Sequence, residues 1–379
     1  MPVDCVFLSR FNTVCGISTY TENLAKSLIS SGLKVAAIAS DHAKIYDLPA
    51  RNDIDKTIPC FPLWAEDGTL DFAAEAALKH EPRVIHIQHE FGVFRNGSAL
   101  KKFCATIKKE KPDTKLVITL HTVHENTPAF LAEILSYIDV IIVHNRISKQ
   151  LLLTNNIVRH YENVRVIHHG MVFPAERKGK EESLQYLGLE DKKGVTYFLS
   201  LGFISIQKKH GIMLQALDAL AKKTYRERKK VGIIIAGLPQ PKSGGGIALI
   251  NSLCKQAKEY GIQNFHLFDC FIQTDELPYF YGAGDICLHV RGSSGYSSSG
   301  SIRLDLSYGM PTLVQKSEIT KDLPVDTVGF FETPFEIVRK MEEIYHDDDL
   351  RERLAHRAQE LAEKDSWRNI GTKHLNAYF

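Results

Sequence analysis

The feature that most constrains the fold of this 379-residue chain is an alternation of short apolar runs with segments of helical period, and it occurs twice. In the first half the runs predict strands at 3–9, 33–40, 84–88, 115–120, 140–143 and 164–167. In the second half they predict strands at 195–201, 231–236, 265–268, 286–290 and 312–315. Because buried apolar strands that alternate with helices form parallel sheets covered on both faces, each half is predicted to be a Rossmann-like α/β domain.

The boundaries of the two predicted domains follow from a break in this pattern. Residues 173–193 are charged and lack apolar periodicity, which is typical of an interdomain linker. We therefore predict one Rossmann-like domain over 1–172 and a second over 194–364. The last segment, 365–379, carries enough apolar area to dock and is predicted to be a helix that packs on the first domain.

The composition argues against several classes of protein. Hydrophobic residues make up 44% of the chain and charged residues 24%, which are ordinary values for a globular protein. The formal net charge is +2, so there is no electrostatic reason to expect a nucleic-acid partner, although local basic runs keep that class open. No apolar run approaches the roughly 20 residues that a membrane helix needs, and peripheral membrane contact is left open.

The cysteines and the start of the sequence predict the compartment. The seven cysteines form no C-x-x-C pair and have no ligand-like spacing to histidine, so we expect a reducing environment and no structural zinc site. The sequence begins with a predicted strand and lacks the charged start and apolar core of a signal peptide. We therefore expect a cytoplasmic protein.

Residues directly after predicted strands are the first candidates for a functional site, because open parallel sheets bind ligands at the carboxyl ends of their strands. Two such sheets that face each other would place the ligand in a cleft between them. Gly16 follows the first strand and precedes a helix, where a glycine lets a phosphate approach the backbone. A turn or a helix cap would also use a lone glycine, and the G-x-G-x-x-G dinucleotide fingerprint is absent.

Polar residues follow three successive predicted strands in the first half. His89 and Glu90 end one strand, and His121 and Thr122 come directly after the next. Packing explains a histidine at the end of a buried parallel strand poorly, so His121 is predicted to be functional. For His89 and Glu90, packing and function are equally open. Asn145 follows the third strand and gives a weaker signal.

The second half carries candidates for phosphate binding. Lys208 and Lys209 lie between a strand-end glycine, Gly202, and a predicted helix, and Gly237 ends another strand. Lysines in such a place suit a diphosphate, while an ordinary pair of surface lysines is the alternative.

A segment at 291–311, RGSSGYSSSGSIRLDLSYGMP, predicts a strand end, a loop dense in Gly and Ser, and a short amphipathic helix. Ser298, Ser299 and Gly300 would present backbone N–H groups at the start of that helix, where the helix dipole favours a phosphate. A flexible loop is the alternative reading of a Ser/Gly cluster, but the order of the surrounding elements favours phosphate binding.

Five segments together resemble the retaining glycosyltransferases of the family-four group, which have the GT-B architecture of two Rossmann-like domains facing across a cleft. The segments, in chain order, are HIQHEFGVF, VITLHTVHE, VIHHG, LGFI followed by KK and G, and SSGSIRLDLSYGMP. The resemblance covers nearly the whole chain. It implies transfer of a hexose from a nucleotide diphosphate sugar of the UDP-glucose or GDP-mannose type, with retention of configuration and without a metal ion or other cofactor. The acceptor would be a glycan, a lipid-linked sugar or another molecule.

The resemblance also implies roles for the candidate residues. The first domain would bind the acceptor and the second the nucleotide-sugar. We predict that His121 and Glu90 are catalytic, and that His89, Thr122 and Asn145 contact the acceptor or the transferred sugar. The predicted donor-binding residues are Gly16, Gly202, Lys208, Lys209, Gly237, Ser298, Ser299, Gly300 and Asp305.

Two departures from the family pattern keep other functions open. The commonest members carry two glutamates eight positions apart, at positions that Tyr296 and Leu304 occupy here, and Asp305 is one position off. The arginine that often follows the second-domain glycine is Phe203. A catalytically inactive, nucleotide-sugar-binding partner subunit would show the same gaps. A transferase that modifies a DNA base or a protein is a further alternative.

Overall fold

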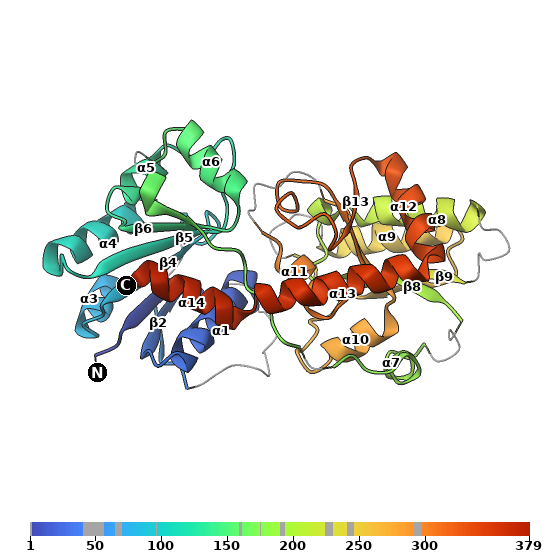
Figure 1. Ribbon diagram of the computed structural model, residues 1–379, viewed down its shortest axis with the longest axis horizontal. Helices are drawn as coiled ribbons and strands as arrows, with labels where there is room; N and C mark the ends of the chain where they lie inside the picture. Colours follow the sequence, from blue (N-terminus) through green and yellow to red (C-terminus); the bar gives the residue numbers. More distant parts are fainter. Residues whose placement is uncertain are drawn as a thin grey trace. The chain divides into compact units, whose positions relative to one another are not determined.

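The computed structural model describes residues 2–40, 57–64, 70–95, 97–158, 161–174, 176–189, 194–223, 230–240, 246–291 and 298–379 (Figure 1). These residues form two compact units. Unit 1 contains the described residues up to Gly170, together with Ser298 and 365–379. Unit 2 contains the described residues from Met171 to 291 and from 299 to 364.

Unit 1 is built on a seven-stranded parallel sheet in the order β3-β2-β1-β4-β5-β6-β7. The strands are β1 (Cys5–Ser9), β2 (Val35–Ser40), β3 (Cys60–Trp64), β4 (Val84–His89), β5 (Lys115–Leu120), β6 (Val140–Val143) and β7 (Val164–Val166). The helices are α1 (Gly16–Ser30), α3 (Asp71–Lys79), α4 (Gly97–Glu110), α5 (Phe130–Leu135), α6 (Arg146–Thr154) and α14 (Trp367–Tyr378).

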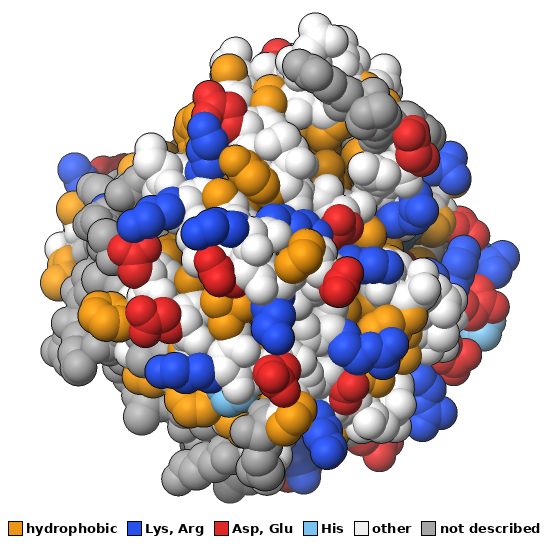
Figure 2. Space-filling view, turned by 90° about the vertical axis from the view of Figure 1, so that its left-hand side faces the viewer, with side chains coloured by type: hydrophobic (Ala, Val, Ile, Leu, Met, Phe, Trp, Pro, Cys, Tyr) orange, Lys and Arg blue, Asp and Glu red, His pale blue; other side chains and the backbone are white. Residues whose placement is uncertain are grey.

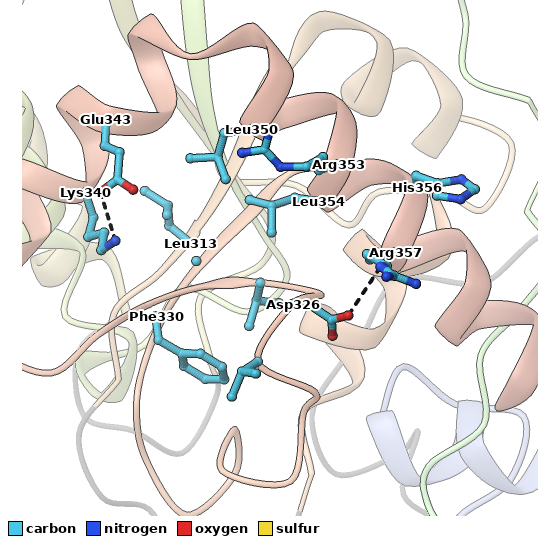
Figure 3. Close-up of a pocket in the computed structure, with 13 residues that line it drawn as sticks. Leu313, Asp326, Phe330, Lys340, Glu343, Leu350, Arg353, Leu354, His356 and Arg357 are labelled. Atoms are coloured by element: carbon cyan, nitrogen blue, oxygen red, sulfur yellow. Dashed lines mark hydrogen bonds and ion pairs between the residues drawn. The ribbon is translucent and has the colours of Figure 1, made fainter.

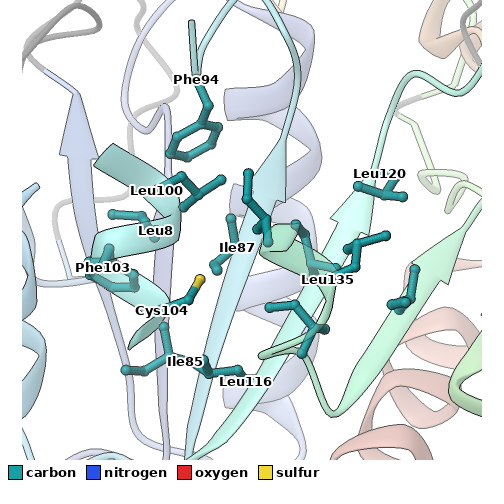
Figure 4. Close-up of a cluster of buried hydrophobic side chains, with 14 of the residues drawn as sticks. Leu8, Ile85, Ile87, Phe94, Leu100, Phe103, Cys104, Leu116, Leu120 and Leu135 are labelled. Atoms are coloured by element: carbon teal, nitrogen blue, oxygen red, sulfur yellow. The ribbon is translucent and has the colours of Figure 1, made fainter. Parts of the chain in front are cut away.

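The two faces of the unit 1 sheet differ in character. Side chains alternate between faces along a strand, so Ile85 and Ile87 of β4 point to one face. There they join an apolar cluster with Leu100 and Phe103 of α4 and Leu135 of α5 (Figure 4). The intervening residues of the strands point to the other face, against which α1 and α14 pack. The helix pair α1 and α14 therefore covers the face that carries the polar side chains.

Unit 2 repeats the plan with a six-stranded parallel sheet in the order β10-β9-β8-β11-β12-β13. The strands are β8 (Thr196–Leu201), β9 (Val231–Ala236), β10 (Phe265–Phe268), β11 (Ile286–His289), β12 (Thr312–Gln315) and β13 (Gly329–Phe331). The helices are α7 (Lys180–Tyr186), α8 (His210–Lys223), α9 (Gly246–Glu259), α10 (Leu277–Ala283), α11 (Gly300–Ser307), α12 (Pro334–His346) and α13 (Asp348–Lys364). Two Rossmann-like domains are thus confirmed.

Each of the predicted strands is present, and two strands were not predicted. Both of these, β3 and β13, lie at a sheet edge. Pro62 lies inside β3, and a proline cannot donate a ladder hydrogen bond, so it is tolerated at an edge and hides the strand from a pattern search. The strand β13 is three residues long and begins with Gly329, which leaves little apolar pattern to detect.

Two predicted segments, the linker at 173–193 and the C-terminal helix, can be compared with the structure. The segment expected to be a linker, 173–193, contains α7, whose Leu184 is fully buried, so this part is folded into unit 2. Charged residues on its exposed turns conceal the short apolar face. At the end of the chain, α14 packs on α1, where the Ser27 hydroxyl donates to the backbone carbonyl of Trp367 at 2.7 Å.

Membrane-spanning helices are not found in the part of the chain that the structure describes: none of its helices combines the length and the apolar character that crossing requires.

Candidate functional site

The strand order reverses once in each sheet, and most of the predicted site residues follow the strands next to these points. In unit 1 the reversal lies between β1 and β4, and in unit 2 it lies between β8 and β11. The carboxyl ends of strands at such a point leave room for a ligand, because the flanking connections run to opposite sides. Gly16 and Glu90 follow strands of the first pair, His89 is the last residue of β4, and Gly202 and Lys208 follow β8 of the second pair.

His121 lies in a cluster of histidines on the polar face of the unit 1 sheet. The register pairs Leu120 with Val143, so the residues that follow, His121 and His144, are neighbours. His121 Nε2 lies 2.8 Å from Gln88 Oε1, and His121 Nδ1 lies 3.3 Å from His144 Nε2. The ring also meets the edge of Tyr20 from α1, with 4.8 Å between centroids.

The cluster keeps His121 neutral. Burial lowers the pKa of His121 well below its usual range, and the neighbouring His144 and His169 act in the same direction. A neutral imidazole can donate one hydrogen bond and accept one. His121 is therefore suited to contact hydroxyl groups, such as those of a sugar, rather than to hold an anion.

Glu90 and Thr122 lie together at the ends of β4 and β5. The Thr122 hydroxyl donates to the Glu90 carboxylate. Burial raises the pKa of Glu90, while hydrogen bonds from Thr122 and from the backbone N–H groups of Gly92 and Phe91 limit the rise, as does the charge of Arg10 at the end of β1. The structure brings this carboxylate to the same sheet edge as His121, where it can accept a hydrogen bond from a hydroxyl.

Two predicted contacts in unit 1 have structural roles. His89 points to the apolar face, opposite to His121, and stacks on Phe94 with 5.8 Å between ring centroids. Burial lowers the pKa of His89 to about 4, and neither ring nitrogen finds a hydrogen-bond partner among the described residues. Asn145 caps α6, since its side chain accepts from the Ser148 N–H at 2.7 Å. The prediction that both contact sugar or acceptor is not supported by these positions.

Gly16 is the first residue of α1 and is exposed. Within the described structure no side chain caps this helix start, and a Cβ at Gly16 would meet nothing within 4 Å. Open backbone N–H groups at a helix start attract anions. The position thus fits the predicted contact with donor phosphates, although steric space alone does not require a glycine.

In unit 2, Lys208 is the buried cation of the site. Only 4% of the residue is exposed, and its ammonium group donates to the backbone carbonyl of Leu201 at 2.6 Å. A Cβ at Gly202, whose φ is +94°, would lie 3.1 Å from Lys208 Nζ and 3.6 Å from Ser301 Cβ. The absence of a side chain at Gly202 therefore keeps a small space open between the lysine and α11.

The charge of Lys208 is incompletely balanced. Burial, and next to it the charge of Arg291 near the end of β11, lower the pKa of Lys208 to about 7, whereas Asp305 acts in the opposite direction. Two cations near one another in a buried place favour an anionic ligand, because such a ligand would stabilise both.

The start of α11 supplies backbone donors at the same sheet edge. Ser299 is the N-cap residue and Gly300 is the first helical residue, which is exposed. The Ser299 hydroxyl lies 3.2 Å from the Ser301 hydroxyl and does not cap the helix. Within the described residues no side chain caps the first N–H groups of α11, and such groups suit a phosphate. Ser298 precedes this turn and groups with unit 1.

For two predicted donor-binding residues of unit 2, Lys209 and Gly237, the backbone conformation and the packing are informative. Lys209 is exposed and adopts a left-handed backbone with φ +45°, so its side chain departs from that of Lys208. Gly237 has φ +147°, and a Cβ there would lie 2.3 Å from the Gly202 carbonyl oxygen, which explains the glycine by packing.

Asp305, predicted to bind the donor, is buried and already hydrogen-bonded within unit 2. It is 1% exposed, and its carboxylate accepts hydrogen bonds from the Tyr281 hydroxyl at 2.7 Å and from His289 Nε2. Its position on α11 beside the buried Leu306 turns it into the core of unit 2. Tyr296, the other position considered for this role, lies outside the described residues.

The sequence places Gln88, His144 and Arg291 at or near strand ends but assigns them no role in the site. Gln88 and His144 hold the ring of His121, and the two-residue alternation along the strands, together with the strand order, was the available signal for them. Arg291 stands two residues after β11, at the reversal point, and adds a positive charge beside Lys208.

A separate cavity of about 690 Å³ lies elsewhere in unit 2, among β12, β13, α12 and α13 (Figure 3). Its lining combines apolar side chains such as Leu313 and Leu354 with ion pairs, including Arg357 with Asp326 at 3.2 Å. None of the predicted site residues lines it. Across the described ranges, no three or more His, Cys, Asp or Glu side chains are grouped so that they could hold a metal ion.

Two family models match the chain in succession. Residues 14–172 match the model described as Glycosyltransferase Family 4, and residues 185–361 match the model described as Glycosyl transferases group 1. At the level of sequence alone, no curated protein matches the chain.

Solved structures with the same fold extend over the whole chain. HepE from Anabaena, in complex with UDP, has a TM-score of 0.75 at 13% identity, with 98% of each chain covered. A glycosyltransferase from Rickettsia africae has a TM-score of 0.76 at 14% identity, covering 99% of this chain and 97% of that one. Sucrose-phosphate synthase from Thermosynechococcus elongatus has a TM-score of 0.74 at 12% identity, covering 99% and 98%. The TM-scores show that this chain shares the GT-B fold with these structures. At sequence identities this low, the similarity shows the fold alone.

Proposed function

The chain belongs to the group 1 glycosyltransferases, and from this premise we propose that it transfers a hexose from a nucleotide diphosphate sugar, with retention of configuration, to a glycan, lipid-linked or other acceptor. HepE has been solved with UDP and with UDP-glucose, which supports a UDP-sugar as the first donor to test and leaves a GDP-mannose type second.

The observation that carries this proposal is the anion site in unit 2. The buried ammonium of Lys208, the open space at Gly202 and the uncapped start of α11 lie at one sheet edge. When the bond between the sugar and the diphosphate breaks, negative charge grows on the leaving oxygen. Donors that are already fixed around that oxygen stabilise the charge and lower the barrier.

The residues of unit 1 suit the uncharged reacting groups, which are the transferred sugar and the acceptor hydroxyl. We assign contact with the transferred sugar to His121, whose neutral ring exchanges hydrogen bonds with hydroxyl groups. We assign the acceptor hydroxyl to Glu90, which can accept its hydrogen bond. In the transfer, the bond from the sugar carbon to the diphosphate breaks, the bond to the acceptor oxygen forms, and the acceptor proton leaves with the diphosphate.

We further propose that transfer needs no metal ion, since Lys208, Arg291 and the start of α11 offer positive charge to the diphosphate. Activity that persists after chelation by EDTA would support this. We also propose a reducing compartment such as the cytoplasm, which agrees with seven free cysteines.

The alternative of an inactive nucleotide-sugar-binding subunit is favoured by Leu304 and Phe203, which replace charged residues common in the family. A transferase acting on DNA has less support. On the face shown in Figure 2, basic and acidic side chains are interspersed. The lysines of α4 pair with carboxylates, namely Lys101 with Glu133, Lys102 with Asp71, Lys108 with Asp139 and Lys109 with Glu110.

A screen of nucleotide-sugars tests the proposal. A donor at about 100 times its Kd should stabilise the folded protein by about 2.7 kcal/mol and raise its melting temperature. The stabilising donor is then assayed for release of free nucleotide with and without candidate acceptors. Stabilisation with release supports the transferase, stabilisation without release supports the inactive subunit, and no stabilisation by any nucleotide-sugar contradicts both.

A further inference from the structure

We infer that one directed chain of hydrogen bonds runs through unit 1 from the Tyr378 hydroxyl to the backbone carbonyl of Ile167, and that it fixes the neutral ring of His121 with its proton on Nδ1. The chain passes through His86, Gln88 and His144, which thereby act as positioning residues for His121. These side chains come from β4, from the ends of β5 and β6, and from α14.

The direction of the chain is set at Ile167. His144 Nδ1 lies 3.1 Å from the Ile167 carbonyl oxygen, which can only accept, so this nitrogen carries a proton. His144 is 3% exposed, and burial favours a neutral ring, which leaves Nε2 with a lone pair. That lone pair faces His121 Nδ1 at 3.3 Å. His121 therefore donates from Nδ1 and keeps a lone pair on Nε2.

Gln88 keeps the same donor-to-acceptor direction between His86 and His121. An amide can exchange its oxygen and nitrogen by a half-turn without a change of shape. With a lone pair on His121 Nε2, the Gln88 NH₂ group donates to it across the 2.8 Å contact. The Gln88 oxygen then takes the place 3.3 Å from His86 Nε2, which carries the proton of that ring.

The chain ends at the C-terminal helix. His86 Nε2 also lies 2.8 Å from the Thr119 hydroxyl oxygen. This oxygen can accept a second hydrogen bond from the proton on His86 Nε2. The lone pair of His86 is then on Nδ1, and the Tyr378 hydroxyl donates to it at 2.6 Å. Every donor on this path meets an acceptor. The reverse direction would need a charged His144 inside a cluster that already holds the pKa of His86 and His121 well below the usual range.

The consequence concerns the proposed transfer and, unlike the protonation pattern itself, rests on the proposed function. His121 Nε2 accepts and cannot donate. A sugar hydroxyl that displaces Gln88 must therefore donate its own proton to His121, and His121 cannot act there as an acid toward the leaving group. The ring selects a donor sugar with a hydroxyl at that place.

Long-range ¹H–¹⁵N correlation spectra of the full chain, labelled with ¹⁵N-histidine and recorded at pH 7.5, test the inference. Single histidine variants assign the signals. The expected result is a proton on Nδ1 of His121 and His144 and on Nε2 of His86. A proton on His121 Nε2, or a doubly protonated His144, overturns it. Because no substrate is needed, this result is independent of whether the protein binds a nucleotide-sugar.

Two matched variants test whether His144 sets the pattern. In His144→Leu the His121 Nδ1–H loses its acceptor, so we expect the proton to move to Nε2, where Gln88 Oε1 can accept it. In His374→Leu, which removes a buried histidine bonded to Tyr20 and to the Ile370 carbonyl, His121 should keep its proton on Nδ1. An unchanged His121 in His144→Leu overturns the role of His144. If that variant does not fold, the wild-type spectrum decides.

Discussion

The two units have the same sheet plan, yet the side chains at their strand ends differ in charge. In unit 1 the ring of His121, whose pKa burial lowers well below its usual range, lies between Gln88 and His144 at the strand ends. In unit 2 the corresponding place holds a buried ammonium, Lys208, near a second cation, with an uncapped helix start beside it. A few residues at each sheet edge therefore decide its electrostatic character.

The largest expected difference between the units is in how well one glycine of each, Gly16 and Gly237, tolerates substitution by alanine. Gly237→Ala should lower the free energy of unfolding by about 3 kcal/mol, because the new Cβ meets the Gly202 carbonyl and the backbone has φ +147°. Gly16→Ala should change it by no more than about 0.5 kcal/mol, since the position is open. Urea denaturation of both variants measures this. Equal losses would contradict a purely steric role for Gly237.

Removal of the buried cation should cause the next largest effect. Lys208→Met should weaken binding of UDP, or of the donor found in the screen, by about 50-fold, or about 2.3 kcal/mol, because a charge-assisted contact to the diphosphate is lost. Lys255→Met is the matched control, since the side chain of Lys255 is 78% exposed. Isothermal calorimetry gives both affinities. If Lys208→Met binds as tightly as the control, the ammonium is not part of the anion site.

Removal of the imidazole from unit 1 should affect turnover rather than donor affinity. His121→Ala should lower kcat by about 20-fold, or about 1.8 kcal/mol, while the Kd for the donor changes by less than about threefold. His356→Ala, which alters an exposed histidine of unit 2, is the control. A loss of affinity equal to the loss of kcat would mean that His121 acts on binding, and the contrast between the units would be weaker than proposed.

The sequence predicts the fold better than it predicts which polar residues face the site. Apolar runs mark the strands because burial on both faces removes polar positions, and they fail at β3 and β13, where an edge needs no such run. For the site, the sequence pairs Lys208 with Lys209. The left-handed backbone at Lys209 separates them, and no local pattern announces that turn.

Asp305 and His89 show what kind of information the sequence does not carry by itself. Asp305 looked like a replacement for a ligand-binding acid, but it is matched by Tyr281 and His289, which come from other elements. His89 and His121 lie at the ends of neighbouring strands, but strand alternation puts their side chains on opposite faces. The partners of Asp305 become visible only in the tertiary contacts. The face to which His89 points follows from the period of the strand.

The smallest expected effect concerns pH, and it separates the two units by the pH range in which each one responds. The unfolded chain holds the Lys208 proton up to its ordinary pKa, whereas the folded free protein loses it above about 7, so this group makes folding more favourable as pH rises above 7. A bound diphosphate favours the charged lysine, so binding must take up a proton above that pH. Donor affinity should then fall by about tenfold, or about 1.4 kcal/mol, from pH 7.5 to 8.5.

Calorimetry at these two pH values, in buffers with different ionisation enthalpies, measures both the affinity and the proton uptake. Lys208→Met should show neither the fall nor the uptake. In unit 1, the buried His89 affects stability in a lower pH range, because burial lowers its pKa to about 4. Its contribution to folding is therefore lost as pH falls from about 6.5 toward 4 and is constant above pH 7. A decline of affinity between pH 7.5 and 8.5 therefore reports on unit 2. A flat profile in the wild-type protein would mean that Lys208 is already charged before the diphosphate arrives, and that the cation is balanced by the protein itself.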